Sequence, residues 1–231
     1  MLHTPITRVV IPALNEENAV GKVIADLPKA LIKEVIVVDN GSTDNTIEKA
    51  HNAGATVLQE SRKGYGSACL KGIDYINNLK EPTDIVAFID ADYSDYPEQM
   101  SEILSPIIND KKDMVIGSRA LGNKEAGSMT FPQRFGNWLA TRMLKLFYNI
   151  KFTDLGPFRA IRLDALNLIN MKDTTYGWTV EMQAKAAKHK LVCCEVPVDY
   201  KQRIGVSKIS GTVKGTILAG YKIIWTILKY A

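Results

Sequence analysis

The stretch Ile85-Val86-Ala87-Phe88-Ile89-Asp90-Ala91-Asp92 is an apolar run that ends in two aspartates. An apolar run of this length predicts a strand that is buried within a sheet. Side chains at positions i and i+2 of an extended segment point the same way, so Asp90 and Asp92 are expected to converge where the strand ends. Carboxylates in this arrangement suit Mg²⁺ or Mn²⁺, which complete their shells with water and substrate phosphates. The alternative is that both aspartates cap a helix beginning near Pro97.

Four further apolar, β-branched runs accompany this one, separated by segments with helical spacing. The predicted strands cover residues 8–11, 35–38, 56–58 and 114–116, and the predicted helices cover 19–27, 43–53, 133–148, 178–189 and 212–230. Strands that alternate with helices predict an α/β fold with a mostly parallel, Rossmann-like sheet covered by helices on both faces. Ligands of such sheets bind beyond the carboxyl ends of the strands.

Polar motifs stand at three of these strand ends, in segments 12–17, 39–44 and 90–95. Asp39 is placed to accept a hydrogen bond from the imide N–H of a nucleobase. Helix capping explains the neighbouring Ser42 and Thr43, but it leaves Asp39 as a costly carboxylate at the end of a buried strand. Segment 12–17 predicts backbone contacts to a base or ribose, with a capped helix start as the alternative.

A fourth motif, Arg62-Lys63-Gly64-Tyr65-Gly66-Ser67-Ala68, is a basic, glycine-containing turn that leads into a helix. The free N–H groups of a helix N-terminus attract anions, so this turn is a candidate phosphate site.

Length and composition predict one substantial domain. The chain has 231 residues, 46% of them apolar, and a formal net charge of +4. That small excess argues against a general nucleic-acid binder, but no acidic residue follows Asp199, so the C-terminal end is expected to seek anionic groups. The three cysteines fit neither a metal site nor a disulfide framework, which favours a reduced, cytoplasmic setting.

Two predicted helices combine apolar surface with basic residues. In segment 133–148 the basic residues Arg134, Arg142 and Lys145 share one sector, and in segment 212–230 Lys214, Lys222 and Lys229 do the same. Such helices lie at a bilayer interface with lysines near the headgroups, or else they pack in the core or in a homo-oligomer. The apolar stretch 215–228 is interrupted by Lys222 and is shorter than the roughly 20 residues of a spanning helix, so we expect no membrane crossing.

In their order along the chain, segments 11–17, 37–46, 63–68, 88–98 and 117–119 resemble family 2 glycosyltransferases of the GT-A fold. Arg203-Ile204-Gly205-Val206-Ser207-Lys208 resembles the Arg-x-x-Gly-x-Ser-Lys segment of the dolichyl-phosphate and polyprenyl-phosphate mannose and glucose synthases. The resemblance implies a single GT-A domain over residues 1–231. Its parts are a nucleotide-sugar-binding half (1–120), an acceptor half (121–210) and an amphipathic, interfacial helix (211–231).

The resemblance also implies a nucleotide-sugar pocket from the first half of the chain, built from Pro12, Leu14, Glu16, Asp39, Lys63, Asp90 and Ala91. Asp90 then faces the donor, and Asp92 holds Mg²⁺ or Mn²⁺. Many relatives have a second aspartate at the position of Asn40 and a glutamine at that of Ser94. These departures leave the third protein ligand of the metal open.

The implied reaction is an inverting transfer of a hexose from a UDP- or GDP-sugar. A cation on Asp92, assisted by Lys63, stabilises the charge that develops on the departing diphosphate. A lipid monophosphate is an acceptor that is already ionised, so it needs positive groups, and Arg119, Arg203 and Lys208 suit that task.

The alternative acceptor is a hydroxyl of a glycan, glycolipid or small molecule. It requires a base, for which Glu181 and Asp154 are the candidates. Otherwise Glu181 is expected to order the acceptor half or the sugar, while Asp154 and Arg159 shape that pocket. The candidate catalytic residues are therefore Asp90, Asp92, Arg119 and Glu181.

The sequence thus predicts transfer to a polyprenyl monophosphate by an enzyme peripheral on the cytoplasmic face of a membrane. Two rivals from other classes are a nucleotide-sugar-binding module without catalysis and a nucleotidyltransferase. The latter normally carries a glycine-rich basic loop after its first strand, where this chain has segment 12–17.

Overall fold

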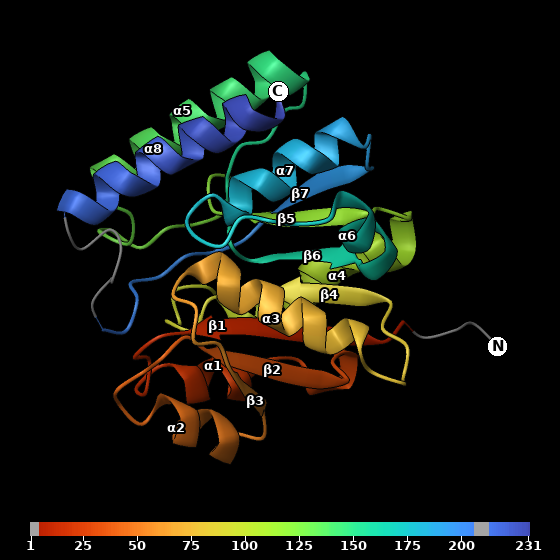
Figure 1. The fold of residues 1–231 in the computed structure, drawn as a ribbon, viewed down its shortest axis with the longest axis vertical. Helices are drawn as coiled ribbons and strands as arrows, with labels where there is room; N and C mark the ends of the chain where they lie inside the picture. The colour runs from red at the N-terminus through yellow and green to blue at the C-terminus, as the bar shows by residue number, and fades with distance from the viewer. Residues whose placement is uncertain (1–4, 206–212) are drawn as a thin grey trace.

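The computed structural model describes residues 5–205 and 213–231. Its central element is a seven-stranded sheet with the order β3-β2-β1-β4-β6-β5-β7 (Figure 1). The strands are β1 (Thr7–Ala13), β2 (Glu34–Asp39), β3 (Thr56–Gln59), β4 (Ile85–Phe88), β5 (Met114–Ser118), β6 (Arg159–Arg162) and β7 (Cys193–Pro197).

The register of the sheet brings the polar strand ends together. β1 pairs in parallel with both β2 and β4, so Ala13 stands opposite Asp39 and Val10 opposite Phe88. The carboxyl ends of β1, β2 and β4 therefore open at the same edge, as the sequence predicts. β6 runs antiparallel to β4 and β5, whereas β7 runs parallel to β5. The expected mostly parallel sheet is confirmed, and the antiparallel β6 is an addition that the sequence patterns do not predict.

Helices cover both faces of the sheet. They are α1 (Val20–Asp26), α2 (Thr46–Asn52), α3 (Tyr65–Asn77), α4 (Met100–Asp110), α5 (Phe131–Tyr148), α6 (Leu163–Ile169), α7 (Trp178–Lys188) and α8 (Val213–Tyr230). One core joins the sheet to α3, α5, α6, α7 and α8, and a second core joins the other face to α1, α2 and α4. The apolar side chains on both faces of the sheet are thereby buried away from water, which is the main stabilising effect in such a fold.

The helices α5 and α8 lie side by side at one end of the molecule (Figure 1). Thr130 and Gln133 form a reciprocal capping box at the start of α5, which satisfies two backbone donors. The hydroxyl of Tyr148 on α5 donates to the carbonyl of Ile227 on α8 at 2.6 Å. The C-terminal helix is thus held against α5, while Leu218, Tyr221, Trp225 and Leu228 on it stay exposed.

Candidate active site

A cavity of about 280 Å³ opens at the carboxyl ends of β1, β2 and β4. Its walls come from these strand ends, the start of α3 and two distant segments: Pro12, Ala13, Leu14, Glu16, Asn40, Lys63, Gly64, Tyr65, Ala68, Asp90, Ala91, Asp92, Tyr176 and Arg203. Six of the seven residues that the resemblance implies for the nucleotide sugar line this cavity. The exception is Asp39.

Asp39 and Asn40, at the end of β2, make different contacts. The carboxylate of Asp39 is buried and accepts the N–H groups of Gly41 at 3.0 Å and Ser42 at 3.2 Å, so it stabilises the turn. Asn40 lines the cavity, and its amide donates to the carbonyls of Glu60 and Arg62, both at 2.9 Å. The contact between Asp39 and a base stays a prediction. An aspartate in place of Asn40 would lose both of these donated hydrogen bonds.

The two aspartates after β4 lie in different surroundings. The hydroxyl of Tyr65 donates to Asp90 Oδ1 at 3.0 Å. Burial, and then the negative charge of Asp92, raise the pKa of Asp90 to about 7. Asp92 Oδ1 accepts the backbone N–H of Ser94 at 3.0 Å and its hydroxyl at 2.5 Å. Ser94 therefore fixes the Asp92 carboxylate and leaves Oδ2 as the oxygen that can take a positive charge.

Arg203 supplies that positive charge in this structure. Its Nη1 lies 3.1 Å from Asp92 Oδ2, and its Nη2 lies 2.7 Å from Glu16 Oε1. The backbone places it there, because the N–H of Ile204 donates to the carbonyl of Asp92 at 2.9 Å. The guanidinium thus bridges two acidic residues across the cavity, and one of them is the predicted metal ligand.

The donor atoms around Asp92 fit a divalent cation. Asp92 Oδ2 already binds a cationic group, and carboxylate oxygens are the ligands that Mg²⁺ and Mn²⁺ prefer. Within residues 5–205 and 213–231, no group of three or more His, Cys, Asp or Glu side chains could hold a metal ion. A site with so few protein ligands suits a cation that keeps water and phosphate oxygens in its shell.

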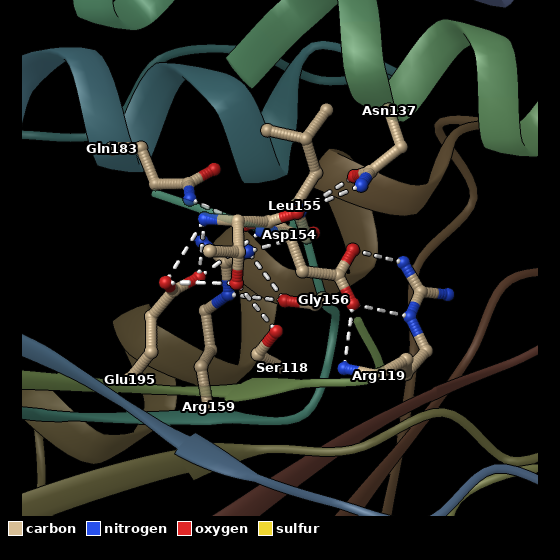
Figure 2. Close-up of polar contacts among 10 residues, drawn as sticks. Ser118, Arg119, Asn137, Asp154, Leu155, Gly156, Arg159, Gln183 and Glu195 are labelled. Carbon is tan, nitrogen blue, oxygen red and sulfur yellow. Dashed lines mark hydrogen bonds and ion pairs between the residues drawn. The ribbon is translucent and has the colours of Figure 1, made fainter. Parts of the chain in front are cut away.

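Arg119, at the end of β5, is held by Asp154 (Figure 2). Its Nε donates to Asp154 Oδ2 at 2.8 Å and its Nη2 to Oδ1 at 2.7 Å, while its backbone N–H donates to Oδ2 at 2.8 Å. Burial would raise the pKa of Asp154, but the charge and hydrogen bonds of Arg119 outweigh burial and lower it. The guanidinium also lies over the ring of Tyr200, 5.0 Å from its centroid. One edge of Arg119 is therefore committed to the protein.

The loop that carries Asp154 is fixed from several elements (Figure 2). Glu195 on β7 accepts the N–H of Asp154 at 3.0 Å, and Gln183 on α7 donates to its carbonyl at 2.8 Å. Arg159 is fully buried and donates to the carbonyls of Leu155 and Gly156, both at 2.9 Å. Asp154 and Arg159 thus stabilise the same short loop through different partners. No hydrogen bond between the two is present among the described residues.

Glu181, on α7, is buried away from the cavity walls. Its carboxylate accepts the N–H groups of Lys172 at 3.0 Å and Asp173 at 2.6 Å, and it pairs with Lys185 Nζ at 2.7 Å. The hydroxyl of Tyr230, on α8, donates to it at 2.8 Å. Its visible work is to hold the segment that leads to the cavity residue Tyr176.

Asp95 is a buried carboxylate that the sequence patterns do not single out. It is 2% exposed, and neither of its carboxylate oxygens has a hydrogen-bond partner within the described part of the chain. Burial, and then the charge of Asp90, raise its pKa well above the usual value. It is not among the residues that line the cavity.

Comparison with known proteins identifies the family. Residues 8–169 match the model of glycosyl transferase family 2. The chain belongs to glycosyl transferase family 2. The sequence-based expectation of a glycosyltransferase is thereby confirmed.

Relatives of the transferase come from bacteria and archaea. An uncharacterised glycosyltransferase of Mycobacterium tuberculosis is 35% identical over 219 residues, which cover 91% of this chain and 93% of the relative. The UDP-N-acetylglucosamine–dolichyl-phosphate N-acetylglucosaminyltransferase of Methanococcus voltae is 28% identical, covering 95% and 93% of the two chains. The undecaprenyl-phosphate mannosyltransferase of Micrococcus luteus is 28% identical, covering 89% and 88%.

Solved structures confirm the expected GT-A fold. Glucosyl-3-phosphoglycerate synthase from Mycobacterium tuberculosis, crystallised with Mn²⁺, UDP and glucosyl-3-phosphoglycerate, matches the transferase with a TM-score of 0.77. The match covers 98% of this chain and 80% of the synthase, at 21% sequence identity. At that identity the likeness concerns the fold alone.

The cavity wall also contains residues that are not among the implied nucleotide-sugar ligands. Gly64 and Tyr65 belong to the basic turn that the sequence marks as a phosphate site, so a signal for them exists. Tyr176 comes from the segment between α6 and α7, which carries no motif. That segment packs closely on the start of α3, because a Cβ at Gly64 would lie 2.2 Å from the carbonyl oxygen of Thr174. Lys208, predicted to bind the acceptor, lies outside the described residues.

The outer faces of α5 and α8 carry large exposed apolar side chains. On α8 they follow helical spacing, at Leu218, Tyr221, Trp225 and Leu228. On α5 they include Phe131, Phe135, Trp138, Leu146 and Phe147. None of the helices in the described part of the transferase is long and apolar enough to cross a membrane.

Proposed function

We propose that the protein transfers a hexose, with inversion and with the help of Mg²⁺ or Mn²⁺, from a UDP- or GDP-sugar to a polyprenyl monophosphate. The acceptor is met at the cytoplasmic face of a membrane. Family membership supports sugar transfer.

The observation that carries the choice concerns the two candidate bases. A hydroxyl acceptor must lose a proton to a carboxylate within hydrogen-bond reach. Asp154 is engaged by three donors of Arg119, and Glu181 is engaged by two backbone N–H groups, Lys185 and Tyr230. Neither lines the cavity. A phosphate acceptor is already ionised near neutral pH and needs no such base.

The donor side of the proposal uses the cavity. Asp92 would hold the cation through Oδ2, and the cation supplies electrostatic stabilisation of the leaving diphosphate. The ammonium of Lys63 stands at the cavity wall, where it donates to the carbonyls of Asn40 at 3.0 Å and Gly41 at 3.3 Å. It adds a fixed positive charge to the diphosphate side without needing to move.

The acceptor side uses guanidinium groups. Arg119 turns its Nε and Nη2 toward Asp154, and its third nitrogen, Nη1, points away from that carboxylate (Figure 2). Arg203 lines the cavity; Arg119 is not part of its wall, but both guanidinium groups act on the charge of Asp90. Two arginines can bind a phosphate through several hydrogen bonds, and this role extends by resemblance to Lys208.

The exposed faces of α5 and α8 support a membrane-bound acceptor. Aromatic residues line α5, where Phe131 stacks on Phe135 with centroids 6.4 Å apart, and Arg142 lies over Trp138. The two helices lie side by side at one end of the molecule (Figure 1), and both carry exposed apolar side chains. Aromatic side chains mixed with basic ones are typical of helices that lie in a bilayer interface.

Relatives favour the same acceptor class. The archaeal relative is named for transfer to dolichyl phosphate and the Micrococcus relative for transfer to undecaprenyl phosphate. The structural neighbour is named for glucosyl-3-phosphoglycerate, and it was also crystallised with phosphoglyceric acid. The acceptor test must therefore separate lipid phosphates from phosphoglyceric acid.

The test presents three acceptors to the protein with Mn²⁺ and several labelled UDP- and GDP-hexoses. These are a short-chain polyprenyl phosphate, the matching polyprenyl alcohol and phosphoglyceric acid. We expect label to enter only the polyprenyl phosphate. Preferred labelling of the alcohol or of phosphoglyceric acid would refute the proposed acceptor.

A variant separates the hydroxyl-acceptor alternative. If Glu181 were the base, Glu181→Gln would lower turnover by about 100-fold or more. We expect turnover near that of the unmodified protein, once protein that unfolds at the assay temperature has been excluded by circular dichroism.

A further inference from the structure

We propose that Arg203 exchanges partners during the reaction: the metal-bound donor displaces it from Asp92, while Glu16 keeps hold of it and turns it toward the acceptor anion. The inference deepens the proposed function and rests on it for the identity of the acceptor. It assigns Glu16 as a positioning residue for the acceptor-binding arginine, in addition to its place on the wall of the donor cavity.

The first step is competition for one oxygen. Asp92 Oδ1 accepts two hydrogen bonds from Ser94, so Oδ2 is the oxygen that faces a cation, and Arg203 Nη1 lies 3.1 Å from it. A divalent cation bound there would meet the guanidinium charge at close range. Two positive charges in a half-buried cavity repel strongly, so both cannot stay on Asp92.

The second step is what keeps Arg203 at the cavity afterwards. Glu16 Oε1 lies 2.7 Å from Nη2, the shorter of the two ion pairs. Glu16 is itself fixed at the entry to α1, since its backbone N–H donates to the hydroxyl of Thr46 at 2.8 Å. The arginine therefore loses one partner and keeps the other, which makes Glu16 a pivot.

The third step is the use of the released edge. The Nε of Arg203 is buried and has no hydrogen-bond partner among residues 5–205 and 213–231, so the guanidinium is incompletely satisfied where it stands. A diphosphate donor and a divalent cation nearly cancel each other's charge, so the loaded donor does not hold the arginine. A second anion, the acceptor phosphate, can then accept hydrogen bonds from the released Nη1, while Glu16 keeps Nη2.

The exchange makes acceptor binding conditional on donor binding. Before the donor arrives, Arg203 neutralises the acidic cavity and is itself occupied. Once metal and donor are bound, the same side chain becomes a phosphate-binding group. No extra moving element is required, because a guanidinium can change partners by rotation of its own side chain.

Mn²⁺ alone, without nucleotide or lipid, tests the competition. Free Mn²⁺ is measured by electron paramagnetic resonance during titration of the unmodified protein, Arg203→Met and Lys201→Met. Lys201 is the matched control, because it carries the same charge two residues away and lies over the rings of Tyr93 and Tyr96 instead of on Asp92.

We expect Arg203→Met to bind Mn²⁺ at least about fivefold more tightly than the unmodified protein, and Lys201→Met to stay within about twofold of it. Equal affinity of Arg203→Met and the unmodified protein would overturn the exchange. Equal tightening in both variants would also overturn it, since that is a long-range effect of net charge. Arg203→Gln replaces Arg203→Met if the latter does not fold.

Glu16→Gln tests the pivot. We expect it to raise the KM for polyprenyl phosphate about tenfold while the KM for the sugar nucleotide changes less than about threefold. An equal rise in both values would assign Glu16 to the donor alone and overturn its role as pivot. The Mn²⁺ titration contains no sugar and no lipid, so its result stands apart from the proposed acceptor, which the three-acceptor assay decides.

Discussion

Both carboxylate oxygens of Asp154 accept hydrogen bonds from the Arg119 guanidinium, and the two residues lie 35 positions apart in the chain. The pair joins the end of β5 to the loop before β6, where the sheet changes from parallel to antiparallel. It therefore fixes the orientation of Arg119 where the chain leaves β5.

Removing one member of this pair leaves a buried charge without its partner. We expect Asp154→Asn to lower the free energy of unfolding by about 3–5 kcal/mol, because the Arg119 guanidinium stays desolvated. Urea unfolding followed by circular dichroism measures the change. The control is Asp164→Asn, which breaks the exposed pair with Arg162 and should cost less than about 1 kcal/mol. Equal losses in the two variants would contradict the importance given to burial.

Because of the Asp154 carboxylate, we expect the free energy of unfolding to depend on pH in the acid range. The pKa of Asp154 is lowered in the folded protein relative to its usual value of 3.8. Its contribution is therefore complete above that value and is lost as the pH falls through the lower, folded pKa. We expect the stability difference between the unmodified protein and Asp154→Asn to be constant above about pH 5 and to shrink below about pH 4. A difference that does not vary with pH would argue against an ionised Asp154.

We expect Ser94 to affect metal affinity, which can be measured without catalysis. Its two hydrogen bonds hold Asp92 Oδ1, so Ser94→Ala frees the carboxylate to rotate. Loss of such a supporting bond typically costs about 10- to 100-fold in metal affinity, and we expect a loss near the lower end because the backbone N–H still donates. Mn²⁺ titration measures it, with the exposed Ser105→Ala as the control. Unchanged affinity would mean that Ser94 does not orient the ligand.

Much of the fold follows from local patterns. The apolar runs that form β1, β2, β4 and β5 are buried on both faces, so their composition alone identifies them. Because parallel strands end at one edge, the motifs after them were expected to meet, and six of the seven implied donor residues do line one cavity. The short β6 escapes prediction because Arg159-Ala160-Ile161-Arg162 has only two apolar residues and is defined by its neighbours.

The contacts of the site depend on pairings far apart in sequence, which local patterns do not contain. Arg203 meets Glu16 across 187 positions, and nothing near either residue indicates the other. Tyr176 reaches the cavity because Glu181 holds the preceding segment. The sequence marks Asp154 and Glu181 as candidate bases, but only the fold shows that other groups already bind both carboxylates.

The outer face of α5 and α8 predicts binding to vesicles. We expect the double variant Trp138→Ser and Trp225→Ser to lose at least about tenfold in affinity for anionic phospholipid vesicles, because two exposed aromatic anchors are removed. Co-sedimentation measures the binding. Leu168→Ser removes an exposed apolar side chain from α6, outside this face, and serves as the control. Unaltered vesicle binding together with a smaller oligomer in sedimentation would instead assign the face to contacts between copies of the chain.

Transfer of a hexose to a lipid phosphate with the aid of a divalent cation is tested by analysis of the lipid product. Protein, Mn²⁺, labelled sugar nucleotide and short-chain polyprenyl phosphate are incubated, and the lipid is analysed by mass spectrometry and ³¹P magnetic resonance. We predict a hexose joined to the lipid through its phosphate, formed in step with release of nucleoside diphosphate, stopped by chelation and restored by Mn²⁺. Product that forms undiminished after exhaustive chelation, or a hexose carried on a hydroxyl, would contradict the account.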